Sequence, residues 1–202
     1  MALAAVCLVL GLAACGGDDE VDAAAERTYV GTVDGTDAYI ALVSDGKQVS
    51  GYLCDGTPKA VKVCRWLDNA ELTGHNAELG ERPHHFLVEA RLGDDEAVGE
   101  VEPYPKAYSF TAEAASGEAG LYRANGEAVR APPAGSGRPE LRSFVEAGWI
   151  VLADGTQRGG VAISDPNTDL RPAPILDPTT LDVQLPRLGP TEASQVRDPN
   201  DL

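Results

Sequence analysis

The chain has 202 residues, which allows one domain with appendages or two very small domains. Hydrophobic residues make up 43% of it, which is an ordinary share for a globular protein. This share argues against a chain that is disordered over its whole length. Acidic residues outnumber basic ones 32 to 16, and no basic patch is visible. Because nucleic-acid binding requires clustered Lys and Arg, this balance excludes DNA and RNA as partners.

The N-terminal segment predicts export and lipid attachment. Residues 1–17 carry no charge and lead into an acidic run; the stretch is too short for a stable membrane span, and its small-residue ending is typical of a secretory signal. Leu12-Ala13-Ala14-Cys15 resembles the lipobox of bacterial prolipoproteins, in which an apolar residue and two small residues precede an obligatory cysteine. The resemblance implies that residues 1–14 are a signal peptide and that Cys15 carries a diacylglyceryl group. The alternative is a buried apolar segment with a chance cysteine.

This resemblance places the protein on the extracytoplasmic face of the cell membrane, because acylation gives stable anchoring. The partner of the Cys15 anchor is then the membrane itself. Residues 15–26 are expected to be a flexible acidic tether, and a β-domain is expected over 27–164.

Cys54 and Cys64 remain once Cys7 and Cys15 are assigned to the signal and the anchor. In an oxidising compartment such a pair predicts a disulfide. The alternatives are two buried thiols or half of a metal site, but a zinc site requires a Cys-x-x-Cys spacing or nearby His ligands, and neither is present here.

Short β-prone runs separated by Gly and Asp turns fill the domain. Residues 28–33, 38–43 and 48–54 are separated by Asp-Gly turns, which are strong hairpin signals. The run 38–43 is apolar throughout, as in a strand covered on both faces. Residues 86–92 alternate, with Phe86, Val88, Ala90 and Leu92 on one face and Glu89 and Arg91 on the other.

Two segments of the domain are ambiguous. Residues 59–67 fit one helical turn or a strand, with Trp66 and Tyr52 expected in the core. The tetrapeptide at 69–72, Asn-Ala-Glu-Leu, is repeated at 76–79, which indicates chance or a local pair of short strands.

The overall pattern predicts an all-β fold, a small antiparallel barrel or sandwich built of hairpins. It resembles uncharacterised secreted domains of high-GC bacteria, without a named family. A linker is expected near 130–140, and a last hairpin over 149–163 completes the sheet. Residues 165–202 hold seven of the 14 prolines and are predicted to be a disordered tail.

No motif points to catalysis, a cofactor or a metal. Ser44-Asp45-Gly46-Lys47 fits Ser-x-x-Lys, but its Asp-Gly pair between two β-runs favours a hairpin turn. His75, His84 and His85 are interpreted as surface residues. The acidic groups at Asp34/Asp37 and Asp94/Asp95/Glu96 are interpreted as solvated turns, since neither follows a calcium-loop pattern.

The leading hypothesis is a non-enzymatic envelope lipoprotein whose β-domain binds a protein partner or a small ligand, or has a structural role. The alternative is an extracytoplasmic hydrolase that uses carboxylates such as Asp34/Asp37 or Asp94/Asp95. A third reading is a lipocalin-like barrel with an apolar ligand, which its 5% aromatic content disfavours.

Overall fold

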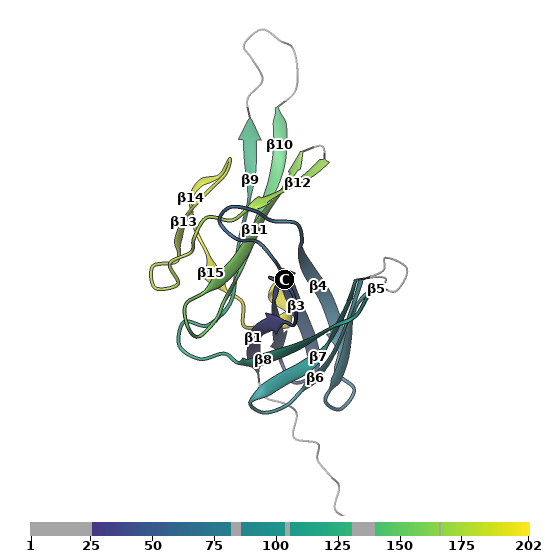
Figure 1. The fold of residues 1–202 in the computed structure, drawn as a ribbon. Coiled ribbons are helices and arrows are strands. Elements are labelled where there is room, and N and C mark those ends of the chain that lie inside the picture. Colours follow the sequence, from purple (N-terminus) through teal and green to yellow (C-terminus); the bar gives the residue numbers. More distant parts are fainter. Residues whose placement is uncertain (1–25, 82–85, 104–105, 131–139, 166) are drawn as a thin grey trace, which may run out of the picture.

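The computed structural model of the protein describes residues 26–81, 86–103, 106–130, 140–165 and 167–202. Strands dominate these residues and no α-helix occurs among them (Figure 1). The all-β prediction is therefore confirmed. The predicted signal peptide, Cys15 and the tether up to residue 25 lie outside the described residues, as do His84 and His85.

Eight antiparallel strands form a near-closed, barrel-like sheet in the order β4-β3-β2-β1-β8-β7-β6-β5. The first strand pairs with the eighth and so joins the two four-stranded halves of the sheet, while β4 and β5 are its two edges. The strands are β1 (Arg27–Val33), β2 (Tyr39–Ser44), β3 (Gln48–Cys54), β4 (Cys64–Glu71), β5 (Asn76–Glu81), β6 (Phe86–Leu92), β7 (Glu96–Pro103) and β8 (Tyr108–Ala114).

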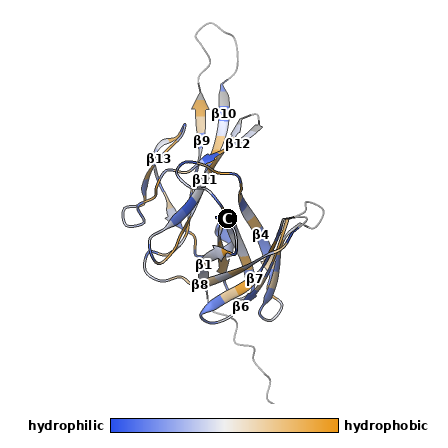
Figure 2. Cartoon of the chain, in the orientation of Figure 1, coloured by the Kyte–Doolittle hydropathy of each residue, from blue (hydrophilic) through white to orange (hydrophobic). Residues whose placement is uncertain are grey.

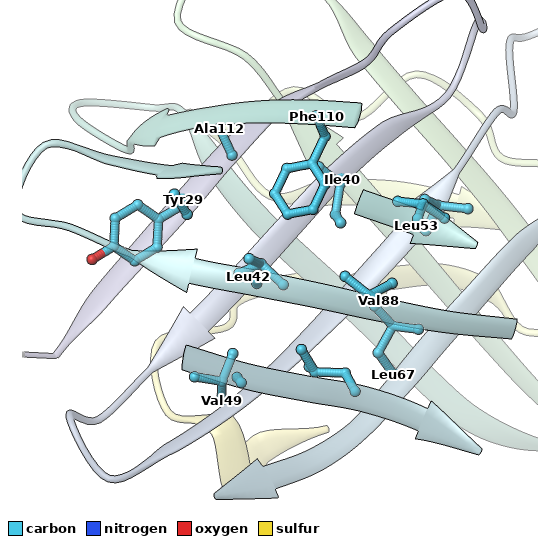
Figure 3. Packing of buried hydrophobic residues seen from close by; sticks show 14 of the residues in the cluster. Tyr29, Ile40, Leu42, Val49, Leu53, Leu67, Val88, Phe110 and Ala112 are labelled. Atoms are coloured by element: carbon cyan, nitrogen blue, oxygen red, sulfur yellow. The ribbon is translucent and has the colours of Figure 1, made fainter. Parts of the chain in front are cut away.

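Side chains that alternate along these strands fill the interior of the sheet. Ile40, Leu42, Leu67, Val88 and Phe110 are at most 2% exposed and point toward one another (Figure 3). The predicted inward face of the segment 86–92, made of Phe86, Val88, Ala90 and Leu92, belongs to this cluster. Hydrophobic and hydrophilic segments alternate along the ribbons accordingly (Figure 2).

A second antiparallel sheet has the order β12-β11-β10-β9-β15. Its strands are β9 (Gly120–Arg130), β10 (Leu141–Val151), β11 (Gln157–Asp165), β12 (Asn167–Pro172) and β15 (Ser194–Gln195). The predicted hairpin at 149–163 is part of β10 and β11, but it belongs to this second sheet and does not complete the first. The expected linker at 130–140 falls mostly outside the described residues, and the strands that flank it pair with each other.

The second sheet packs on the outer face of β1–β3, which explains why β2 is apolar on both faces. Ala41 and Val43 of β2 contact a cluster that includes Leu121 and Ile150 of the second sheet. Every residue of β2 is buried, as its uninterrupted apolar sequence predicts.

Two aromatic rings pack directly against the backbone of Gly148 at this interface. The Tyr52 ring lies 4.1 Å from that of Trp66, and a Cβ at Gly148 would come within 2.7 Å of both. Tyr52 is buried, as predicted, whereas Trp66 is half-buried. Glycine at 148 thus lets the two layers approach closely.

The prediction of a disordered tail over 165–202 is wrong. The described residues 167–202 form β12, β15, the hairpin of β13 (Asp182–Leu185) and β14 (Gly189–Glu192), and a 3-10 helix at Pro199–Asp201. Leu176, Val183 and Leu185 pack against the face of the second sheet that the barrel does not cover. Pro172 ends β12, Pro190 lies in the two-stranded hairpin and Pro199 begins the 3-10 helix, and at such positions few backbone donors are needed.

The two ambiguous segments also resolve as strands. From Cys64 onward, the segment 59–67 belongs to β4. The repeated tetrapeptides lie at the end of β4 and in β5, which are the two edges of the first sheet.

Candidate functional site

A groove of about 950 Å³ lies where the two edges of the first sheet meet. It is lined by β4, by Thr73 in the turn that follows it, and by β5, β6 and β7. The lining residues are Asp68, Asn69, Ala70, Glu71, Thr73, Asn76, Ala77, Glu78, Gly80, Glu89, Ala90, Arg91, Val98, Gly99 and Glu100.

Acidic side chains dominate the lining. Strand pairing sets Glu78 directly opposite Glu89, and Glu89 directly opposite Glu100, so that one glutamate row crosses three strands. Like charges in directly opposite positions destabilise a sheet. With Asp68 and Glu71 the lining holds five carboxylates, against the single guanidinium of Arg91.

Simple strand alternation positions these groups. In β6 the residues on either side of Glu89 are buried in the sheet interior, which turns the Glu89 and Arg91 side chains outward. In the adjacent row Arg91 is paired with Val98, whose 38% exposure gives the groove an apolar patch. The groove therefore combines a strong negative charge with a small apolar surface.

An irregularity in β4 adds to the acidic surface. The register between β3 and β4 shifts between Val49 and Gly51, so two residues of β4 lie opposite Ser50 alone. These are Asp68 and Asn69, and both are exposed while their neighbours Leu67 and Ala70 pack toward the interior. Asn69 Nδ2 also donates to Asn200 Oδ1 at 3.0 Å, which ties this edge to the C-terminal segment.

The groove is open because the hairpin between β4 and β5 separates after its first bridge. Thr73 and Asn76 exchange backbone hydrogen bonds of 2.9 and 3.2 Å across the turn, and no ladder between the two strands follows in the described residues. A ladder continued in this register would set Glu71 directly opposite Glu78. Such a pair would add a third directly opposite glutamate pair to Glu78–Glu89 and Glu89–Glu100, and its two carboxylates increase the negative charge at this seam.

The carboxylate groups singled out in the sequence lie elsewhere. Asp34 and Asp37 are exposed in the turn between β1 and β2, and Asp94 and Asp95 are exposed between β6 and β7. Asp94 pairs with Arg27 at 3.0 Å and its side chain is 92% exposed. The fold does not bring the two acidic groups together. Both lie on turns, as expected.

The remaining candidates also occupy turns. The segment Ser44–Lys47 connects β2 to β3, and Asp45 Oδ1 accepts hydrogen bonds from the backbone N–H groups of Gln48 and Lys47. These bonds, that of Gln48 first, hold the pKa of Asp45 below its usual value. The hairpin interpretation of Ser-x-x-Lys is confirmed, and His75 is exposed beside Asn76 at the turn into β5.

Cys54 and Cys64 form the predicted disulfide, with their Cα atoms 4.0 Å apart. It joins paired positions of β3 and β4 at the interface with the second sheet, where a Cβ at Gly160 would come within 2.5 Å of the Cys64 Sγ. Among the described residues no group of three or more His, Cys, Asp or Glu side chains could hold a metal ion.

Comparison with family models, with curated proteins and with solved structures finds no match for this chain. None of the described residues belongs to a helix with the length and apolarity needed to cross a membrane.

Sequence reasoning did not identify the groove. The sequence pattern placed Glu89 on an outward face and contained the repeated tetrapeptides that carry Glu71 and Glu78. It did not show that Glu78 and Glu89 are neighbours across two strands. The available signal was the spacing of eleven residues between Glu78, Glu89 and Glu100, which places them in one row when three strands form successive hairpins.

Proposed function

We propose that the protein is a lipid-anchored, extracytoplasmic binding module without catalytic activity. The acidic groove between β4 and β7 is the observation that carries the binding role, because it concentrates five carboxylates on strands held in a regular sheet. Its open shape favours a protein partner of the envelope over a small ligand, since small-molecule sites enclose most of the ligand surface.

The proposed location depends on the N-terminal sequence. The resemblance of Leu12–Cys15 to a lipobox supports a lipid on Cys15, and the Cys54–Cys64 disulfide fits an oxidising compartment outside the cytoplasm. A tether of residues 16–26 reaches at most about 40 Å when extended. The groove of an anchored chain would therefore remain close to the membrane surface.

Cell fractionation with paired cysteine variants tests the anchor. The wild-type chain should partition into the membrane and detergent phase and incorporate labelled palmitate, and Cys15→Ser should lose the label. Cys7→Ser is the matched control, because Cys7 lies in the segment that cleavage removes. An unlabelled wild-type chain, or a Cys15→Ser chain labelled as strongly as the wild type, would contradict the proposal.

Site-specific cross-linking tests the binding role. A photoreactive residue at position 100 in the groove should capture an envelope protein, whereas one at position 192 on the tail hairpin should not. Equal capture from both positions would argue against the groove. Measurable hydrolytic turnover by the purified chain would argue against a non-enzymatic role.

A further inference from the structure

The outer edge of β4 is an open strand edge that borders the acidic groove. Among the described residues β4 pairs with β3 alone. Just before β4 begins, the Asp55 N–H donates to the Val63 carbonyl, so the backbone groups of Val63 point toward β3. Because this direction alternates along a strand, the backbone groups of Arg65 and Leu67 also point toward β3. The backbone groups of Trp66 consequently face the open edge.

The second part of β4 follows the same rule. The Leu72 N–H donates to the Lys47 carbonyl at 2.7 Å, which turns the backbone groups of Ala70 toward β3. Those of Asn69 and Glu71 therefore face the groove. Unpaired backbone groups on a strand edge can pair with an added strand, and the bulge at Asp68 and Asn69 divides this edge into two pairing segments, one on each side of it.

The chain does not cover this edge with its own β5. As described above, continuation of the β4–β5 hairpin would oppose Glu71 and Glu78, and the ladder ends after the Thr73–Asn76 bridge. If a strand with positive side chains paired with β4 instead, those side chains would lie beside carboxylates on the groove side. The exposed carboxylates of Asp68 and Glu71 thus favour a cationic occupant of this edge.

We infer that the open edge of β4 binds an extended, cationic segment of a partner protein, which adds to the sheet as a strand facing β5. The inference rests on the proposed binding function and specifies its partner. Main-chain hydrogen bonds to the edge supply affinity, and alternate side chains supply specificity.

The two faces of the edge define the occupant. On the groove face Asp68 and Glu71 are exposed, so the partner strand should carry Lys or Arg at the positions that face them. On the opposite face Ala70 and Leu67 pack against the interior cluster, so the intervening positions suit small apolar residues such as Val or Ala. The partner segment alternates basic and apolar residues over the length of a short strand.

A labelled peptide of sequence Lys-Val-Lys-Val-Lys-Val-Lys, capped at both ends, tests the inference against the full chain in detergent by fluorescence anisotropy. Binding should be saturable. A peptide of equal charge with alternate backbone amides N-methylated should bind about tenfold more weakly or worse, because it cannot complete the strand pairing. Equal affinity for the two peptides would overturn strand addition and indicate attraction by charge alone.

Variants locate the site. The double variant Asp68→Asn/Glu71→Gln keeps side-chain size and should also weaken binding about tenfold, since it removes two carboxylates beside the edge. Glu192→Gln on the tail hairpin is the matched control and should bind as the wild type does. Equal losses in both variants, or none in either, would overturn the assignment to β4.

The inference and the proposed function can fail separately. A chain that carries the Cys15 lipid and cross-links to an envelope protein through position 100, but binds no cationic strand, would overturn only the inference. A chain that binds the peptide at β4 but lacks the lipid would overturn the proposed anchoring.

Discussion

Leu176 provides the sharpest test of how the C-terminal segment contributes to the fold. Its side chain is 1% exposed within the cluster on the second sheet, and its backbone N–H donates to Gln157 Oε1 at 2.9 Å. Truncation of a fully buried leucine costs about 2 to 5 kcal/mol, depending on how far the cavity collapses. We expect Leu176→Ala to reduce the free energy of unfolding by that amount.

The neighbouring Ile175 supplies the control, since its side chain is 68% exposed. Ile175→Ala should change the free energy of unfolding by about 0.5 kcal/mol or less. In a chain of this size the Leu176→Ala loss corresponds to a fall in melting temperature of roughly 4 to 20 °C.

Thermal and urea unfolding followed by circular dichroism and tryptophan fluorescence would measure the difference. Trp149 is a direct reporter, because its Nε1 donates to the Pro174 carbonyl at 2.8 Å. Indistinguishable midpoints for Leu176→Ala and Ile175→Ala would refute the packing of this segment on the second sheet.

Three other predictions follow from the turns and the interface. Replacing both Cys54 and Cys64 with Ala should lower the free energy of unfolding by about 3 kcal/mol, since the bridge closes a short loop; unchanged urea midpoints would contradict this. Gly148→Ala should cost about 1–3 kcal/mol, because its Cβ would overlap the aromatic rings packed there, and an unaffected melting temperature would argue against that contact. For Asp45 the folded pKa is lowered, so its stabilising contribution is present above about pH 4 and is lost as the pH falls through the folded value. Asp45→Asn should therefore be less stable than the wild type at pH 7 and converge with it once the pH falls below the lowered pKa of Asp45, whereas a difference independent of pH would contradict the assigned hydrogen bonds.

Local turn chemistry made much of the first sheet predictable. The Asp-Gly turns at Gly35 and Gly46 of the first sheet have φ of 67° and 86°, and Gly155 in the second sheet has φ of 79°, a conformation that glycine adopts without cost. Alternation in β6 and the uninterrupted apolar sequence of β2 similarly indicated which faces are buried.

Features that depend on contacts between distant elements were not predictable in this way. Proline content suggested disorder after Asp165, because the sequence alone does not show that the second sheet has an uncovered face for Leu176 and Val183 to pack against. The groove was missed for the same reason. Glu78, Glu89 and Glu100 read as separate solvent-facing residues until strand register sets them side by side.

Intact-mass and peptide mass spectrometry of the chain purified from native membranes would test the central claim most directly. The account predicts a mature polypeptide that begins at Cys15, with a diacylglyceryl thioether on that residue and the disulfide between Cys54 and Cys64 intact. Recovery of a chain that retains residues 1–14 and an unmodified Cys15 would contradict it.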